Sequence, residues 1–128
     1  MRVTSVTQGN IYISKETSIP AQLFSGEFMP YQGDLLLIDY SSKPGNSKMN
    51  IHTVSPLNFQ RISKVCVTSI NGRTGVVDDF IFFTLDSLHT LPGYIPALTD
   101  IVNVVVVDSI QSQYTYRVVA MFPVKMLY

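Results

Sequence analysis

Tryptophan is absent from this 128-residue chain, cysteine occurs once, and charged residues make up only 14% of the sequence. The single cysteine, Cys66, cannot form a disulfide within the chain and is too few for a cysteine zinc site. This indicates a reducing compartment, cytoplasmic or also nuclear. Nine Lys and Arg residues balance nine Asp and Glu residues, so the chain lacks the basic excess that attracts a phosphate backbone. No apolar run approaches the roughly 18 residues of a membrane-spanning helix, so we expect no membrane association.

Residues that could catalyse a reaction are also few. His52 and His89 do not lie at metal-ligand spacing from another His, Cys, Asp or Glu. Cys66 lies between two valines in strand-like sequence, where cysteine usually behaves as a small hydrophobe. The adjacent acids Asp78 and Asp79 follow a strand at an expected turn, and no phosphate-binding glycine loop is present. We therefore expect no enzyme activity, no cofactor, no metal and no small-molecule substrate.

An internal repeat is the most informative feature that is present. The corresponding pairs are Val3–Val6 with Val67–Ile70, Phe28–Pro30 with Tyr94–Pro96, Gly33–Ile38 with Thr99–Val104, and Thr53–Leu57 with Met121–Val124. The order of these pairs predicts two copies of one unit of about 60 residues. We place the copies at residues 1–58 and 63–128, joined by a short linker at Leu57–Ser63.

Each copy contains short apolar runs bounded by Gly, Pro, Asn and Ser, which is typical of strands. The strands predicted in the first copy are Arg2–Val6, Asn10–Ser14, Ser18–Leu23, Asp34–Tyr40 and Met49–Ser55. Those predicted in the second copy are Lys64–Ile70, Gly75–Val77, Phe80–Leu85, Asp100–Ser109 and Tyr114–Val124. Because Val102–Val107 is almost entirely β-branched, we expect a central strand there that is buried on both faces. Tight hairpin turns are expected at Asn71-Gly72 and Pro44-Gly45-Asn46.

Five short strands per copy, with long connections at Leu23–Tyr31 and Leu85–Leu98, suit a small closed Greek-key barrel of the OB or cold-shock kind. The predicted fold is therefore all-β, with two tandem five-stranded OB/cold-shock-like barrels that share an interface. A partly open sandwich is the alternative. The abrupt start at Met1 and the end at Tyr128 suggest a piece of a longer protein.

The two strands of the second copy around residues 71–85 resemble those of a cold-shock domain. In that family, phenylalanines on both strands and a histidine on the second present rings to single-stranded bases. Here Phe82 is retained, whereas Thr74 and Val76 stand at phenylalanine positions of the first motif. Thr84 and Leu85 replace the histidine and a phenylalanine of the second motif, so most of the stacking platform is missing.

Alternation along this strand places Phe80 and Phe82 on one face and Ile81 and Phe83 on the other. Either all four side chains are buried, or Phe80 and Phe82 are exposed beside Arg73. On the last strand, Tyr114, Tyr116 and Arg117 either extend such a surface or plug the end of the barrel. The candidate nucleic-acid contacts are Lys64, Arg73, Phe80, Phe82, Tyr116 and Arg117.

A second resemblance extends through almost the whole chain. It is carried by Asn10–Ser14, Tyr31–Leu36, Lys64–Ser69, Ile81–Leu88 and Ile101–Val105. These segments are similar to the cancer/testis antigen 55 family and, less closely, to the N-terminal region of the testis-specific RNA helicase of the piRNA pathway. The resemblance implies a role in germ cells and in spermatogenesis. None of the helicase motifs is present, so no ATPase activity carries over.

Two hypotheses for function follow. In the first, the chain is a non-catalytic tandem OB-like interaction module that docks protein partners in a germ-cell complex. Zero net charge, the loss of most cold-shock aromatics and the high apolar content favour this hypothesis. In the second, it binds single-stranded RNA or DNA in a germline RNA (piRNA) pathway, as the fold resemblance implies.

Overall fold

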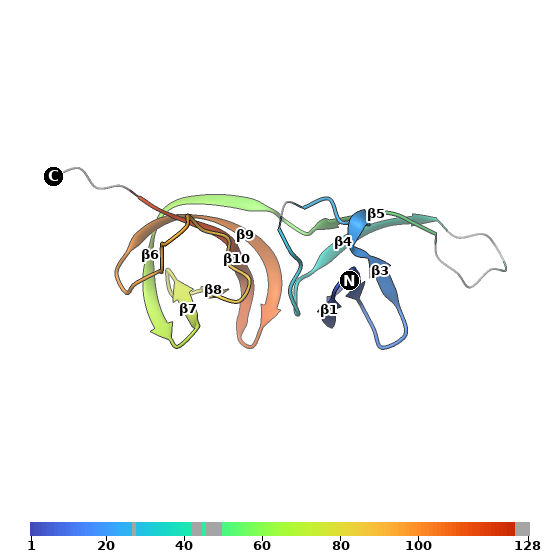
Figure 1. Cartoon of the computed structure of the whole chain (residues 1–128), viewed down its shortest axis with the longest axis horizontal. Helices are drawn as coiled ribbons and strands as arrows, with labels where there is room; N and C mark the ends of the chain where they lie inside the picture. Colours follow the sequence, from blue (N-terminus) through green and yellow to red (C-terminus); the bar gives the residue numbers. More distant parts are fainter. Residues whose placement is uncertain (27, 42–44, 46–49, 125–128) are drawn as a thin grey trace. The chain divides into compact units, whose positions relative to one another are not determined.

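The computed structural model describes residues 1–26, 28–41, 45 and 50–124. The chain divides into two compact units, Met1–Leu57 and Asn58–Tyr128, where the sequence predicted copies at 1–58 and 63–128. The described residues form five strands in each unit and one helix, the short 3₁₀ turn η1 (Ala21–Leu23). Figure 1 shows the course of the chain through these elements. No described helix is long and apolar enough to cross a membrane. The predicted all-β class is confirmed.

The first unit forms two small antiparallel sheets. Its strands are β1 (Ser5–Thr7), β2 (Asn10–Tyr12), β3 (Ser18–Pro20), β4 (Leu36–Ser41) and β5 (Asn50–Pro56). Strands β1, β2 and β3 pair in that order, and β4 pairs with β5. Isolated bridges from Arg2 to Leu35 and from Phe24 to Val54 connect segments outside these ladders.

The second unit forms one continuous sheet. Its strands are β6 (Gln60–Asn71), β7 (Thr74–Val77), β8 (Ile81–Thr84), β9 (Ile101–Gln111) and β10 (Tyr114–Pro123). They pair in the order β10-β8-β7-β6-β9, and β9 pairs back to β10, so the pairing closes on itself. The contact between β10 and β8 is parallel and consists of a single register pair, Arg117 with Phe82.

These pairings correct several predictions. Two OB-like barrels are not confirmed, because the strands of the first unit lie in two separate sheets. The predicted linker Leu57–Ser63 overlaps β6, which begins at Gln60 because this part of the strand pairs with β9. The hairpin between β6 and β7 turns at Gly72-Arg73, one residue later than predicted, with Gly72 at a φ of 62°. The predicted turn at Pro44-Gly45-Asn46 and the predicted strand start at Met49 lie outside the described residues, Gly45 excepted.

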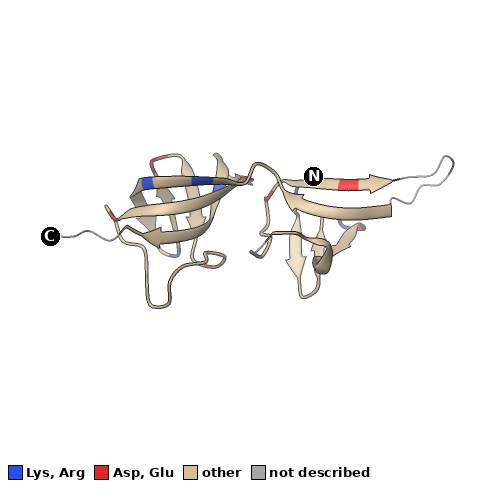
Figure 2. Ribbon diagram, turned by 90° about the horizontal axis from the view of Figure 1, so that it is seen from above, with Lys and Arg blue, Asp and Glu red and all other residues tan. Residues whose placement is uncertain are grey.

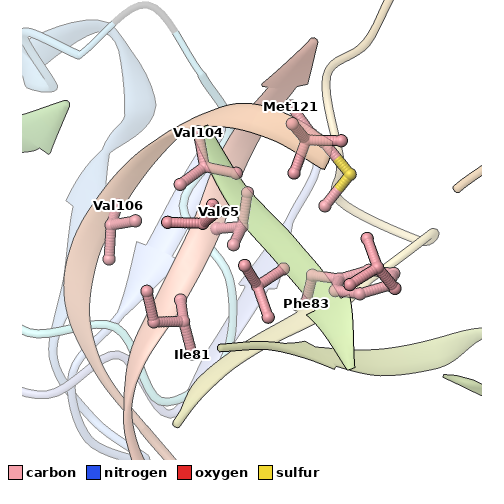
Figure 3. Close-up of a cluster of buried hydrophobic side chains, with 10 residues drawn as sticks. Val65, Ile81, Phe83, Val104, Val106 and Met121 are labelled. Atoms are coloured by element: carbon pink, nitrogen blue, oxygen red, sulfur yellow. The ribbon is translucent and has the colours of Figure 1, made fainter. Parts of the chain in front are cut away.

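The core of the second unit comes from alternate residues of its strands. Figure 3 shows Val65, Ile81, Phe83, Val104, Val106 and Met121 gathered in this cluster, to which β6, β8, β9 and β10 contribute. The face of β8 that contains Ile81 and Phe83 is therefore the buried one. Strand β9 is central in its pairing, as predicted, but it is not buried on both faces, because Asn103 is exposed and Val105 is only half-buried.

A smaller core holds the first unit together. Its fully or almost fully buried members come from the N-terminal segment and from the strands: Val3, Ile11, Ile19, Leu36 and Val54. Burying an aliphatic side chain of this size contributes about 1.5–3 kcal/mol, which makes these residues the main source of stability in so small a unit.

Equivalent backbone hydrogen bonds occur in the two units just before β4 and β9. In the first unit, Val3 N–H donates to the Asp34 carbonyl at 2.8 Å and Gly33 N–H donates to the Val3 carbonyl at 2.8 Å. In the second unit, Val67 makes the same pair of bonds with Asp100 and Thr99, at 2.9 Å each. The two copies therefore share backbone geometry at the residues that the sequence aligned.

The repeat also identifies a strained residue. Gly33 has a φ of 96°, and its counterpart Thr99 has a φ of 71°. A β-branched residue is unfavourable in this left-handed region, whereas glycine adopts it freely. We expect Thr99→Gly to raise the free energy of unfolding by about 1 kcal/mol, since relief of strain exceeds the added entropy of the unfolded chain.

Equilibrium denaturant unfolding would measure this change. The reciprocal variant Gly33→Thr is the matched control and should lower stability, because it places the same strain in the first unit. A lower midpoint for Thr99→Gly than for the native chain would contradict the prediction.

Candidate functional site

Four aromatic residues on or directly before β8 and on β10 form two ring pairs, and one of them, Tyr116, packs against the hydrophobic core cluster of the second unit. Phe80 and Tyr116 meet edge to face, with ring centroids 6.2 Å apart, and Phe82 and Tyr114 stack at 6.3 Å with an interplanar angle of 26°. Phe80 is 51% exposed, and the other three rings are half-buried. Of the two alternatives posed by the sequence, the structure therefore favours a partly exposed aromatic face.

Arg73 lies in the turn between β6 and β7, but its charge is paired. Its Nε donates to Asp86 Oδ1 at 2.7 Å, and the two side chains are 66% and 54% exposed. An ion pair this exposed stabilises a fold by only about 0–1 kcal/mol, so a phosphate could displace Asp86 at small cost. The Arg73 guanidinium therefore remains accessible to a phosphate group of a ligand.

Arg117 is the clearest correction to the candidate contacts. It is fully buried, and its Nη1 donates to Ser87 Oγ at 2.8 Å. Ser87 follows β8 in the long connection to β9, so this connection lies against the strand β10 that carries Arg117. A guanidinium that solvent does not reach cannot contact a nucleic-acid backbone, and Arg117 is removed from the candidate contacts.

Lys64 is exposed but lies apart from the aromatic pairs in the strand order. It sits at an irregularity in β6, with a φ of 55°, where its backbone N–H donates to Asn103 Oδ1 at 2.9 Å. Strand β6 pairs with β7 and β9 rather than with β8 or β10. Figure 2 shows the Lys and Arg positions as short, separate segments in mostly uncharged ribbon. Neither Lys64 nor the buried Arg117 therefore joins the aromatic pairs in one exposed surface.

The groups considered for catalysis are separated from one another. His52 Nε2 lies 3.0 Å from Ser41 Oγ on an exposed part of the β4–β5 sheet, and the His89 ring meets Phe122 at 6.2 Å. Cys66 is half-buried. Among the described residues, no group of three or more His, Cys, Asp or Glu side chains could hold a metal ion.

The adjacent acids Asp78 and Asp79 form the turn between β7 and β8, as predicted. Both have positive φ angles, 50° and 64°, and Asp78 Oδ1 accepts the Cys66 N–H at 2.9 Å. The Asp78 carboxylate therefore stabilises the turn between β7 and β8.

The connection between β8 and β9 contains a carboxylate that fixes its conformation. Asp100 Oδ2 accepts the Tyr94 hydroxyl at 2.7 Å and the Ala97 N–H at 3.0 Å. In addition, Tyr94 N–H donates to the Leu91 carbonyl at 3.1 Å. These bonds hold residues 91–100 in one conformation although the segment has no regular secondary structure.

This fixed connection exposes three large aliphatic side chains, which sequence reasoning missed. Leu91, Ile95 and Leu98 are 52%, 72% and 57% exposed. The available signal was the proline-containing, uncharged sequence between His89 and Asp100. Because contiguous exposed apolar side chains mark interaction surfaces, these three residues of one connection are the candidate protein-docking residues.

The hydrogen bond between Tyr94 and Asp100 leads to a test of this conformation. Burial first, and then hydrogen bonding to and the charge of the Asp100 carboxylate, raise the pKa of Tyr94 above its ordinary value. A tyrosine with a raised pKa contributes stability that is complete below about pH 10 and is lost as the pH rises toward the folded-state pKa.

We expect Tyr94→Phe to lower the free energy of unfolding by about 1 kcal/mol at neutral pH, because a single hydrogen bond is lost. Above about pH 10, the difference from the native chain should shrink, since only the native chain loses the contribution of this hydroxyl. Denaturant unfolding at pH 7 and pH 10.5 would measure both effects. A stability difference between Tyr94→Phe and the native chain that grows with pH would contradict the hydrogen bond between the neutral Tyr94 hydroxyl and Asp100.

The chain is similar in sequence to one protein family and to known RNA helicases. Residues 1–57 match the family described as the cancer/testis antigen 55 N-terminal domain. Over 123 residues, the chain is 45% identical to the RNA helicase Mov10l1 of Mus musculus and 42% identical to that of Homo sapiens. These alignments cover 96% of this chain and 10% of each helicase, so the chain spans about a tenth of the length of these relatives. No solved structure matches the chain.

The first structural unit, Met1–Leu57, coincides with the region that the family match covers. The resemblance predicted from the residues is therefore confirmed: the chain is similar to the Mov10l1 RNA helicases over nearly its whole length, and its residues 1–57 match the cancer/testis antigen 55 N-terminal domain.

Proposed function

We propose that this chain is a non-catalytic interaction module of a germ-cell protein, with a role in spermatogenesis, and that it docks protein partners. The observation that carries the proposal is the exposure of Leu91, Ile95 and Leu98 on one fixed connection. The module acts in the cytoplasm or nucleus, where a chain with one free cysteine is stable without disulfides.

A fixed loop is well suited to docking because its ordering entropy is already lost before the partner binds. Asp100 accepts two hydrogen bonds from within the loop, from Tyr94 and Ala97. Binding then costs less than it would for a flexible segment carrying the same side chains. Aliphatic side chains buried against a partner act as anchors, and a few such anchors usually supply most of the affinity of an interface.

The absence of charge from this connection supports a protein partner over a nucleic acid. No Lys, Arg, Asp or Glu occurs from Thr90 to Thr99. Nucleic-acid affinity depends on cations that displace counterions, and none is available on this loop. The docking surface is therefore expected to bind with little dependence on salt concentration.

The test uses the chain with Leu91, Ile95 and Leu98 all changed to serine. Proteins from testis extract that the native chain retains, but the triple variant does not, would be purified and titrated against both chains. We expect the triple change to raise Kd by at least about tenfold. Ile70→Ser, an exposed aliphatic of the second unit outside the loop, is the control and should leave Kd unchanged. If the triple variant retains every protein as well as the native chain does, the proposal is wrong.

The second candidate function is binding of single-stranded RNA or DNA by the aromatic face. It is favoured by the partly exposed Phe80 and Phe82 and by the strand order of the second unit. The pairing order β10-β8-β7-β6-β9 is compatible with a five-stranded Greek-key barrel of the OB type, a fold whose second and third strands bind oligonucleotides. The name of the relatives, RNA helicase, is consistent with this candidate.

Fluorescence anisotropy with labelled single-stranded RNA and DNA, at low and near-physiological salt, separates the two candidates. Base stacking on one ring is worth about 1–3 kcal/mol, so Phe82→Ala should weaken RNA binding about fivefold or more if this face is used. Arg73→Ala should then reduce the salt dependence as well. Absence of binding even at low salt would exclude this second candidate for the chain.

A further inference from the structure

The N-terminal segment pairs with the edge of β4 that faces away from β5, but it covers only the first residue of the strand. The Leu36 N–H donates to the Met1 carbonyl at 2.7 Å, and the Met1 nitrogen donates to the Leu36 carbonyl at 2.9 Å. An isolated antiparallel bridge joins Arg2 to Leu35. Among the described residues, no strand continues this pairing past Leu36. Strand β4 therefore has an open edge from Leu37 onward.

The alternation of the backbone identifies the groups that this open edge presents. In an antiparallel sheet, the N–H and C=O groups of successive residues point to opposite sides of the strand. Those of Leu36 point toward the N-terminal segment, whereas the Leu35 carbonyl points the other way and accepts the Leu57 N–H at 3.1 Å. The register shift between β4 and β5 skips a residue of β5, so β4 keeps its regular alternation. The backbone groups of Ile38 and Tyr40 therefore point toward the open edge.

The side chains of β4 show what kind of strand would cover this edge. Ile38 and Tyr40 share the face of the buried Leu36; Ile38 packs against the core of the first unit, and Tyr40 is 51% exposed. Leu37, which is 60% exposed, and the exposed Asp39 lie on the opposite face. Among the described residues, Asp39 forms no ion pair. A Lys or Arg in the added strand would cover Leu37 with its stem and reach Asp39 with its charge.

The same carboxylate disfavours a second copy of β4 as the added strand. Two copies would use all of these groups if Ile38 of each paired with Tyr40 of the other. Asp39 of one copy would then lie directly opposite Asp39 of the other, and like charges in that position are destabilising. Charged side chains on edge strands commonly prevent such self-association. The open edge therefore favours a basic strand from another protein.

We propose that the open edge of β4 binds an extended strand of another protein, antiparallel to β4, in which apolar residues alternate with Lys or Arg. Main-chain hydrogen bonds to Ile38 and Tyr40 supply the affinity, and Asp39 selects for the basic residues. The added strand continues the pairing that Met1 begins on the same edge. This inference goes beyond the proposed function, because it concerns the first unit and does not rest on the docking residues between β8 and β9.

The test is a titration of the complete chain with labelled peptides, followed by fluorescence anisotropy. The first probe alternates valine and lysine over about six residues, an ordinary strand length. When its valines lie on the face of Ile38 and Tyr40, the valine N–H groups point toward β4 and the lysine N–H groups point away. The second probe carries glutamate in place of lysine. Two further probes have the first sequence with N-methyl groups either on the valines or on the lysines.

We expect the glutamate probe to bind at least about threefold more weakly than the lysine probe, because Asp39 repels it. The probe methylated on valine should bind at least about tenfold more weakly, because it lacks the donors that face β4. The probe methylated on lysine should bind like the unmodified one, since its altered nitrogens face away from β4. The two methylated probes have the same composition and charge, so a difference between them identifies backbone pairing.

Matched variants of the chain reverse the sign of one exposed carboxylate. Asp39→Lys should bind the glutamate probe more tightly than the lysine probe, which is the opposite of the native order. Glu16→Lys changes another exposed acid of the first unit, outside β4, and should keep the native order. Because both side chains are exposed, both variants should unfold at the native denaturant midpoint. An unchanged order for Asp39→Lys would overturn the role of Asp39 and with it the inference.

Amide hydrogen exchange locates the bound peptide. The lysine probe should slow exchange at Ile38 and Tyr40 and leave Leu37 and Asp39 unchanged, because the amides of these two residues already face β5. Slower exchange on another strand, with Ile38 and Tyr40 unaffected, would show that the peptide binds elsewhere and would overturn the inference.

The remaining failures are also distinguishable. If no probe binds, or if methylation on valine has no effect, β4 does not accept a strand by backbone pairing and the inference is wrong. If the native chain is a dimer in which the Ile38 and Tyr40 amides are already protected, a second copy fills the edge and the inference is again wrong. Changing Leu91, Ile95 and Leu98 to serine should leave peptide binding unchanged, so this inference and the proposed function fail independently.

Discussion

Replacing Gly75 by alanine is expected to lower the free energy of unfolding of the second unit by about 2 kcal/mol. A Cβ at this position would lie 2.4 Å from Phe83 Cζ and 2.6 Å from the backbone carbonyl oxygen of Ser69. Phe83 is 1% exposed and part of the core, and Ser69 belongs to β6, which pairs with β7. Neither neighbour can move away without disrupting packing or pairing, and such overpacking typically costs about 1–3 kcal/mol.

Gly26→Ala is the matched control for this prediction. Its Cβ would also lie close to a ring, 2.5 Å from Phe24 Cε2, but Phe24 is only half-buried. Because Phe24 pairs edge to face with Phe28 and packs against the core only from a half-buried position, we expect a smaller loss than for Gly75→Ala, about 1 kcal/mol. Denaturant unfolding followed by circular dichroism would compare the two variants. Equal midpoints for Gly75→Ala and the native chain would show that the close approach of Gly75 to Phe83 is not rigid.

Local patterns in the sequence were sufficient to predict the ten strands. Strand signals are short-range, because alternation and turn-forming residues act over a few positions. Predicted strand ends were less accurate where pairing extends a strand, as at Gln60, or where a turn replaces one, as at Ala21–Leu23. Those ends depend on partners distant in the sequence, which a local pattern does not contain.

The buried face of β8 illustrates a different limit. Both faces of this strand carry phenylalanine, so alternation separates Phe82, together with Phe80 just before the strand, from Ile81 and Phe83 without showing which pair is buried. Which pair is buried depends on β10, because its residues Tyr114 and Tyr116 pack against the rings of Phe82 and Phe80. Parallel pairing between β8 and β10 joins residues that are 35 positions apart, Phe82 and Arg117.

The candidate site was predicted less well than the fold, for a physical reason. A basic residue is exposed in most proteins, so the sequence favours a surface position for every Lys and Arg. Arg117 departs from this rule because Ser87, 30 residues away in the sequence, accepts a hydrogen bond from its guanidinium. The exposed aliphatic residues of the connection between β8 and β9 depart from the opposite rule. Ile95, a residue type usually buried, is the most exposed large apolar side chain among the described residues.

Replacing Arg117 by alanine is expected to lower the free energy of unfolding of the second unit by about 3 kcal/mol. The side chain is fully buried, and its removal leaves a cavity between β10 and its surroundings, which costs about 2–5 kcal/mol for a large side chain. Ser87→Ala should cost less, about 1.5 kcal/mol, because it leaves the guanidinium in place but removes one acceptor. Arg117→Met keeps most of the volume and should be the mildest change at position 117.

This prediction determines how nucleic-acid binding by the chain must be tested. Arg117→Ala would reduce RNA binding through loss of folded protein, and the reduction would be mistaken for loss of a phosphate contact. Unfolding curves and anisotropy titrations of Arg117→Ala and Arg117→Met separate the two causes. If both variants keep native stability while RNA affinity and its salt dependence fall, Arg117 reaches the ligand and its burial is not maintained in solution. The structure predicts the opposite result: a destabilised alanine variant, and a methionine variant whose RNA affinity, if any, equals that of the native chain.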